Sequence, residues 1–146
     1  YTYGFALRAG YNFYKTWSLS GNLNYNNLIE QKKSDVFITG FNTPNWSANV
    51  QFGNKEVFKN FGFNIVWKWQ QSYLWQSPLA TGNVPSYNTF DAQVSYRLEK
   101  QKINIKAGGT NILNTRYYQY AAGPTIGATY YLSLIYDFGF KKKTNE

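Results

Sequence analysis

Alternation of apolar and polar residues is the dominant pattern of this chain, and it is clearest in residues 129–138. Every second residue there is apolar, with aromatic residues at both ends, while most of the intervening residues are polar. A period of two predicts a β-strand with one apolar face. The same alternation recurs in six earlier stretches, so the sequence predicts seven strands: 1–12, 17–27, 45–53, 61–70, 90–98, 103–110 and 129–138.

The connections between these stretches alternate between short and long. Residues 13–16, 54–60 and 99–102 form short links, whereas 28–44, 71–89 and 111–128 form long ones. Strands of about 9–11 residues are long enough to cross a bilayer when tilted. Short periplasmic turns and long outer loops are typical of barrels in the bacterial outer membrane. This pattern predicts a C-terminus in the periplasm, with residues 1–140 in the barrel and 141–146 as a basic periplasmic tail.

Aromatic residues on the apolar faces fall at two heights of the predicted sheet. A membrane barrel places such rings at both membrane–water interfaces, whereas a soluble sandwich has no reason to do so. Tyr25, Trp46, Trp69, Phe90 and Tyr130 are predicted at the outer level of this girdle. The periplasmic level is predicted to contain Tyr11, Trp17, Phe52, Phe61, Tyr96 and Phe138.

Seven strands do not close a barrel. Bacterial single-chain barrels have even strand numbers, and an open edge leaves backbone groups unpaired in lipid. We therefore expect an all-β, transmembrane antiparallel barrel of which this chain supplies the last seven strands, the others lying before Tyr1. A soluble, aromatic-rich β-sandwich that binds sugars is the rival from a different class.

Composition and charge narrow the function. Aromatic residues make up 21% of the 146 residues, while mean hydropathy is −0.51. The net charge of +8 comes mainly from short turns and residues 141–143 rather than from one stripe, so we expect no nucleic-acid partner. The chain contains no His and no Cys. Its 7 carboxylates are not predicted to bring two acidic side chains together as a general acid and base. We expect no catalytic site, no metal site and no cofactor.

Four segments carry a resemblance to a known family. They are FNTPNW (41–46), GNVPSYNTFDAQVSYRL (82–98), TNILNTRYYQY (110–120) and YYLSLIYDF (130–138). Together they resemble the C-terminal part of TonB-dependent outer-membrane receptors, most closely those of the Bacteroidota with an N-terminal carboxypeptidase-regulatory-like domain. Two departures are that the chain continues beyond Phe138 and that Gly127-Ala128 replaces the family's usual Gly-Arg.

The resemblance implies a barrel of roughly 22 strands that encloses an N-terminal plug. It implies ligand binding by outer loops and gated import energised by a TonB-type protein. The implied partners are outer-membrane lipid, the plug, the remaining strands and a surface lipoprotein or other envelope subunit. The alternative is a receptor-like barrel that serves as a structural subunit of an outer-membrane complex.

Two sets of residues are candidates for contact with a ligand or the plug. The first set points into the predicted lumen, where it forms either solvated, plug-facing charges or a path for an anionic ligand: Arg8, Lys68, Asp91, Arg97 and Lys106. The second set lies in long loops, where rings either stack on a ligand or pack against loops and a partner lipoprotein: Tyr73, Trp75, Tyr117, Tyr118 and Tyr120. Chelated iron, a corrinoid, a glycan and a peptide all remain open as ligands.

Overall fold

A computed structural model describes residues 1–29 and 40–138, and the predicted basic tail 141–146 lies outside these residues. The elements are β1 (Thr2–Phe13), β2 (Trp17–Leu28), β3 (Trp46–Phe58), β4 (Phe61–Gln70), β5 (Tyr73–Gln76), β6 (Thr81–Val84), β7 (Tyr87–Leu98), β8 (Ile103–Thr110) and β9 (Thr129–Tyr136). No helix with the length and hydrophobicity needed to span a membrane occurs in this part of the chain.

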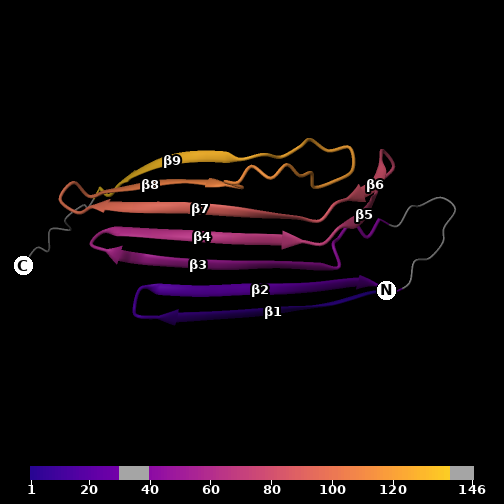
Figure 1. Ribbon diagram of the computed structural model, residues 1–146, viewed down its shortest axis with the longest axis horizontal. Helices are drawn as coiled ribbons and strands as arrows, with labels where there is room; N and C mark the ends of the chain where they lie inside the picture. Colours follow the sequence, from indigo (N-terminus) through magenta and orange to yellow (C-terminus); the bar gives the residue numbers. More distant parts are fainter. Residues whose placement is uncertain (30–39, 139–146) are drawn as a thin grey trace, which may run out of the picture.

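Seven strands form one antiparallel sheet in the order β1-β2-β3-β4-β7-β8-β9, and β5 and β6 form a separate hairpin. Figure 1 shows the sheet as a single layer with the three short turns at its left end. The connection between β8 and β9 and the β5–β6 hairpin lie at its right end. We call these the short-turn end and the long-loop end. The predicted seven-strand antiparallel architecture is confirmed.

The strand register places mostly apolar side chains on one side of the sheet and mostly polar side chains on the other. Directly opposed residues in antiparallel strands point to the same face. One row of opposed residues runs through Leu7, Leu23, Ala48 and Trp69 and ends at Asn88. The adjacent row, on the opposite face, consists of Arg8, Asn22, Asn49, Lys68 and Thr89. We call the two sides the apolar face and the polar face.

In the described part of the chain no second sheet or helix covers the apolar face, which meets only Ile112 of the β8–β9 connection near Gly109 and Tyr130. Val84 is the one buried hydrophobic residue of the described ranges, and Leu132 on the apolar face remains 70% exposed. A water-soluble sheet removes such side chains from water by packing against a second layer, since burial of apolar surface drives folding. The described strands thus form a single layer rather than the two packed sheets of a sandwich, and this layer leaves a surface that suits lipid.

Tight turns at the short-turn end depend on residues in the left-handed backbone region. Asn60 has a φ of 67° in the two-residue link between β3 and β4, and Lys102 has a φ of 55° before β8. Asn tolerates this conformation better than most residues because its short side chain hydrogen-bonds locally. These turns fix the register locally, which keeps the two faces separate.

Strand boundaries differ from the prediction by two residues or more in three places. β3 runs on to Phe58 through an irregularity after Asn54, whose side-chain Oδ1 accepts the backbone N–H of Glu56 at 2.7 Å. β7 begins at Tyr87, three residues before the predicted start, and β9 ends at Tyr136. The β5–β6 hairpin was not predicted, because strands of four residues show too little alternation to be recognised.

Candidate ligand-binding site

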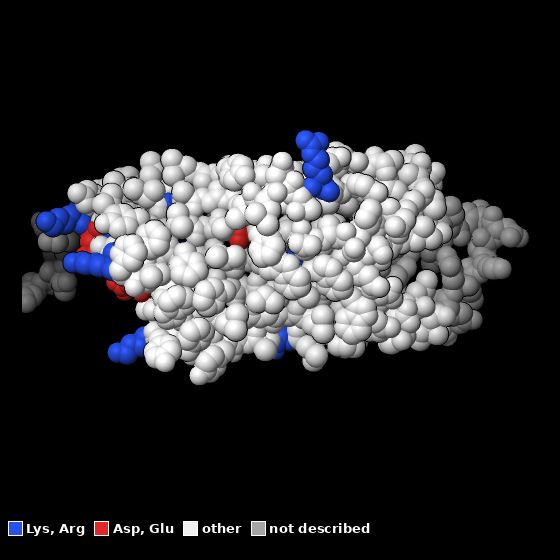
Figure 2. Space-filling model, in the orientation of Figure 1, with Lys and Arg blue, Asp and Glu red and all other residues white. Residues whose placement is uncertain are grey.

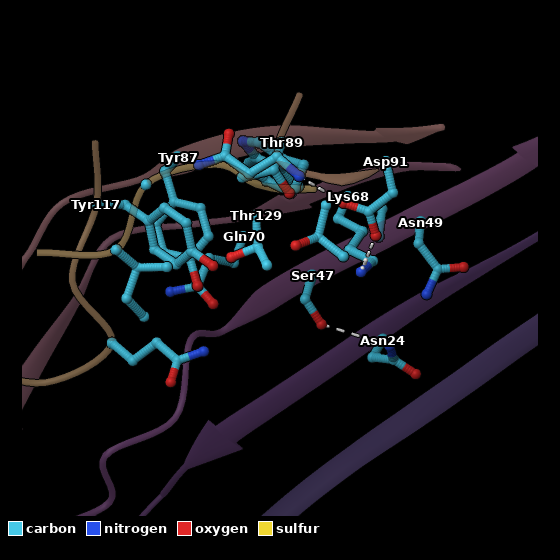
Figure 3. A pocket seen from close by; sticks show the side chains of 17 residues that line it. Asn24, Ser47, Asn49, Lys68, Gln70, Tyr87, Thr89, Asp91, Tyr117 and Thr129 are labelled. Carbon is cyan, nitrogen blue, oxygen red and sulfur yellow. Dashed lines mark hydrogen bonds and ion pairs between the residues drawn. The ribbon is translucent and has the colours of Figure 1, made fainter. Parts of the chain in front are cut away.

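The polar face contains a hollow of about 320 Å³ near the long-loop end. Two neighbouring rows of the sheet form its floor. One row consists of Asn24, Ser47, Gln70 and Tyr87, and the next contains Asn49, Lys68 and Thr89. Figure 3 shows Tyr117 next to Tyr87 at one side of these side chains, and Tyr117 belongs to the connection between β8 and β9. We call this connection, residues 111–128, the cover loop.

Asn111 fixes the start of the cover loop. Its side chain is almost fully buried and its φ is 51°, a backbone conformation that Asn adopts more readily than larger residues. The Asn111 amide donates to the carbonyl of Thr115 at 2.7 Å and accepts the Thr115 N–H at 3.0 Å. The side chain of Asn114 then accepts the N–H of Ala128 at 3.0 Å, near the other end of the loop. The TNILNT segment thus forms a closed turn.

Asp91 joins this turn to the floor of the hollow. One carboxylate oxygen accepts the backbone N–H of Asn111 at 2.9 Å, and the other forms an ion pair with Lys68. The Asp91 side chain is 17% exposed and that of Lys68 is 51% exposed. The structure therefore brings together two of the predicted lumen-facing charges, and each neutralises the other.

Tyr117 covers one side of the hollow. Its ring stacks on that of Tyr87 with a centroid distance of 4.1 Å. Its backbone forms an isolated antiparallel bridge with Ile126, so the cover loop folds back on itself over the polar face. Stacked aromatic pairs contribute to stability beyond their burial. The pair therefore holds the middle of the cover loop against the sheet.

The other predicted loop aromatics connect the cover loop to the β5–β6 hairpin. The Tyr73 hydroxyl donates to the carbonyl of Gln119 at 2.5 Å, and burial raises the pKa of Tyr73 above its ordinary value. The Trp75 and Tyr120 rings lie 5.6 Å apart. The Tyr118 hydroxyl donates to a backbone carbonyl of β6 at 3.3 Å. These contacts support the loop-packing interpretation, and contact of these rings with a ligand stays a prediction.

Asn42 attaches the end of the first long connection to the same assembly. Its amide donates to the carbonyl of Gln76 at 2.9 Å and accepts the Gln76 N–H at 2.7 Å, as a paired strand residue would. Asn45 donates to the carbonyl of Asn26 at 2.9 Å. The FNTPNW segment thus links β2 to the edge of β5.

The remaining predicted lumen-facing cations lie outside the hollow. Arg8, Arg97 and Lys106 occupy polar-face positions, and Arg97 lies beside Glu99 at the short-turn end. The structure does not bring these three side chains to Lys68 and Asp91. In the described residues no three potential metal ligands of the His, Cys, Asp and Glu types gather. The plug-facing or ligand-guiding role of these cations stays a prediction.

The predicted girdle residues occupy apolar-face positions. At the long-loop end the Tyr25 and Trp46 rings lie 4.6 Å apart, and at the short-turn end the Trp17 and Phe52 rings lie 5.3 Å apart. The other girdle candidates occupy the same face by register: Tyr11, Phe61, Trp69, Phe90, Tyr96 and Tyr130. Phe138 follows β9, with its ring 4.5 Å from that of Tyr136. Their contact with the membrane interfaces stays a prediction.

Several lining residues were missed by the sequence reasoning. Tyr87 precedes the predicted start of its strand, and Asn24, Ser47 and Gln70 are ordinary members of a polar alternation. The strand register alone aligns them in one row. The TNILNT segment was a recognisable signal, but nothing in the sequence indicated that Asp91 would hold it.

Comparison with known proteins places these features in context. Residues 1–134 match the sequence profile of the outer membrane protein beta-barrel family. No curated protein gives a significant match.

Several solved structures share the fold. The siderophore receptor PiuA from Acinetobacter baumannii aligns over 91% of this chain and 21% of its own length, with a TM-score of 0.68 and 20% identity. The copper transporter OprC aligns over 91% of this chain and 23% of its own, with a TM-score of 0.67 and 16% identity. A mutant of the ferric enterobactin receptor PfeA from Pseudomonas aeruginosa aligns over 90% and 21%, with a TM-score of 0.63 and 17% identity. The chain thus spans less than a quarter of each of these proteins.

Proposed function

Because this chain belongs to the outer membrane protein beta-barrel family, we propose that it forms the C-terminal part of a gated importer of the TonB-dependent type. The family consists of barrels of the bacterial outer membrane rather than enzymes. The three solved structures include two named as receptors and one named as a transporter, and they share the fold of this chain at low identity. On the basis of this similarity we propose that the complete protein binds a ligand and lets it pass, without covalent chemistry.

The hollow under the cover loop is the observation that carries this proposal. It lies on the polar face at the long-loop end, while the opposite face of the same strands is apolar and is not covered by a second layer in the described residues. In a closed barrel the polar face lines the lumen and the long loops face outward. A ligand arriving from outside would therefore meet the hollow before any deeper part of the lumen.

The proposal requires further protein on both edges of the sheet. In the described residues β1 and β9 each pair with one neighbouring strand only. Unpaired backbone groups are costly in lipid, so additional strands would close the barrel between these edges. An N-terminal plug would fill the lumen and contact Arg8, Arg97 and Lys106, and a TonB-type protein would supply energy from below. The short-turn end, and with it the C-terminus, would lie in the periplasm.

The Bacteroidota subgroup with a carboxypeptidase-regulatory-like domain remains our proposed assignment. It rests on the combined resemblance of segments 41–46, 82–98, 110–120 and 130–138. Two of these segments have structural roles at the long-loop end, where Asn42 binds the β5 edge and Asn111 closes the turn of the cover loop.

Uptake measurements in the source bacterium would test the import proposal. Wild-type cells and a strain lacking the complete gene would be given labelled ferric enterobactin, cyanocobalamin, a neutral oligosaccharide or a short peptide. We expect one probe to accumulate in wild-type cells and to be lost both on deletion and on treatment with a protonophore. Accumulation that survives the protonophore, or equal uptake of every probe by both strains, would contradict gated import.

A second candidate function is a structural subunit of an outer-membrane complex, in which the long-loop end docks other envelope proteins. Leu79 at the tip of the β5–β6 hairpin is 97% exposed and Leu74 on β5 is 54% exposed. Contact with another protein would remove both side chains from water. Co-purification of envelope proteins in fixed stoichiometry, lost in a Leu74→Ser, Leu79→Ser double variant, together with normal uptake on deletion, would favour this candidate.

A further inference from the structure

We propose that the hollow under the cover loop binds a neutral, hydroxyl-rich ligand, namely a carbohydrate, rather than an anionic chelate or a metal ion. This inference rests on the proposed importer function and names the ligand class for its outer site. It follows from the charge of the hollow, from the chemistry of its polar groups and from its size.

Charge argues against an anionic ligand. Lys68 is the cation on the floor of the hollow, and it is already paired with Asp91. Both carboxylate oxygens of Asp91 have partners, so this residue has little capacity left for a cation. Binding an anion would require breaking this pair and leaving the Asp91 carboxylate without its partner.

Most other cations lie away from the hollow. On the face shown in Figure 2, several Lys and Arg side chains lie at the left, which is the short-turn end, and others lie at the upper and lower edges nearer the middle. Basic residues in or next to the short turns are Lys15, Lys55, Lys59, Arg97, Lys100 and Lys102. Arg116 is the one cation within the cover loop, and it is not among the residues that line the hollow.

Amides and hydroxyls supply the remaining polar groups of the lining. Asn24, Ser47, Asn49, Gln70, Thr89 and Thr129 offer both donors and acceptors without net charge. The Gln70 Nε2 group is buried and has no hydrogen-bond partner within the described structure. A buried donor of this kind calls for an acceptor, which a ligand hydroxyl provides while also donating to a neighbouring amide oxygen.

The aromatic residues of the lining also suit a sugar ring. The stacked Tyr87 and Tyr117 rings line one side of the hollow. Aromatic faces carry negative charge density and attract the weakly positive C–H groups of a sugar ring. The volume of about 320 Å³ is at the lower end of the range for small-molecule sites, which is enough for one or two sugar units.

The lining of the hollow contains few side chains that coordinate metal ions. Asp91 is the one carboxylate among the lining residues, and the chain contains no His, Cys or Met. Soft and borderline metals such as copper prefer imidazole and sulfur ligands. The hollow therefore differs in donor chemistry from a copper-binding site.

Binding measurements on the complete natural protein, purified in detergent, would test the inference. The protein would be applied to an array of neutral oligosaccharides, and the strongest binder would be titrated by calorimetry. Ferric enterobactin, Cu²⁺ and a neutral tripeptide would be titrated in parallel. We expect a neutral saccharide to bind and the other three probes not to compete with it.

Variants locate the binding to the hollow. Gln70→Leu and Asn49→Leu each remove a neutral hydrogen-bonding group from the floor and should weaken saccharide binding about tenfold. Gln51→Leu is the matched control, since Gln51 lies on the polar face of β3 but outside the lining, and it should leave affinity unchanged. Circular dichroism of each variant would verify that the barrel is intact.

Three results would overturn the inference. They are the absence of saccharide binding, saccharide affinity that is unchanged in both Gln70→Leu and Asn49→Leu, and displacement of the saccharide by ferric enterobactin, Cu²⁺ or the tripeptide. Failure of import would be recognised separately. Saccharide binding without energy-dependent uptake would contradict the importer proposal alone, whereas energy-dependent uptake of a ferric chelate would contradict the ligand class alone.

Discussion

The two ends of the sheet are held together by different kinds of contact. At the short-turn end each turn is formed by a few consecutive residues, such as the two-residue link that contains Asn60. At the long-loop end, segments distant in sequence hold one another: Asn42 binds β5, Tyr73 binds the cover loop and Asp91 binds Asn111. Local turns set the register of the strands, whereas the non-local contacts create the hollow. Function should therefore be more sensitive to change at the long-loop end.

Asn111→Ala, at the long-loop end, should have the largest effect on stability. It removes both hydrogen bonds with Thr115 and places a less suitable residue in the left-handed region. We expect a loss of about 2–4 kcal/mol in unfolding free energy. Urea unfolding of the complete protein in lipid vesicles would measure it, and limited proteolysis should show cleavage within residues 111–128. A wild-type cleavage pattern would contradict the anchoring role of Asn111.

Asn60→Val tests the short-turn end with a smaller, local effect. The β-branched side chain disfavours the φ of 67°, so we expect a loss of about 1–2 kcal/mol in unfolding free energy. Asn60→Gly is the control and should be close to neutral, because Gly adopts this conformation readily. Protease sensitivity of residues 111–128 should be unchanged in both variants. If it increased, the two ends would be coupled and the comparison would fail.

The Tyr87–Tyr117 stack should contribute about 0.5–1.5 kcal/mol of coupling energy in a double-mutant cycle. Tyr87→Leu, Tyr117→Leu and the double variant would be compared by unfolding in vesicles. The two single effects should sum to more than the effect of the double variant, since either substitution removes the stack. Additive effects would show that the rings do not hold the cover loop against the sheet.

Lys68→Ala should have the smallest effect on stability. The Lys68 side chain is half exposed, so loss of its ion pair should cost about 0.2–1 kcal/mol. The Asp91 carboxylate still accepts the backbone N–H of Asn111, which should keep the cover loop in place. Asp91→Asn is the comparison variant. Unfolding of both variants in vesicles at low and at high salt would separate the ion pair with Lys68 from the hydrogen bond that Asp91 accepts from Asn111. A large loss for Lys68→Ala that persists at high salt would contradict this assignment.

The strands and their faces could be predicted from the sequence because their signal is local and periodic. The alternation of Leu132 and Ser133 on β9 is visible without any knowledge of neighbouring strands. The hollow could not be predicted in this way. Gln70 and Tyr87 become neighbours only through the pairing of β4 with β7 across the β5–β6 hairpin, and the link from Asp91 to Asn111 depends on the same register.

Residue roles at the long-loop end illustrate the same limit. The sequence identified Lys68 and Asp91 as facing one side, but their pairing follows from diagonal positions on β4 and β7. Tyr73 and Tyr118 were recognised as loop aromatics, whereas their hydroxyl contacts with backbone carbonyls required the folded loops. Polar contacts between loops carry no periodic signal, so only coordinates reveal them.

Cysteine accessibility along β9 would test most directly whether one face of the sheet meets lipid and the other meets water. Single cysteines would replace Tyr131, Leu132, Ser133 and Leu134 in the complete protein, in a background otherwise free of cysteine, and would be treated in intact outer membranes with a water-soluble maleimide. We predict labelling at positions 131 and 133 and protection at 132 and 134, because the latter two belong to the apolar face. Equal labelling at all four positions, or the reverse alternation, would contradict the account.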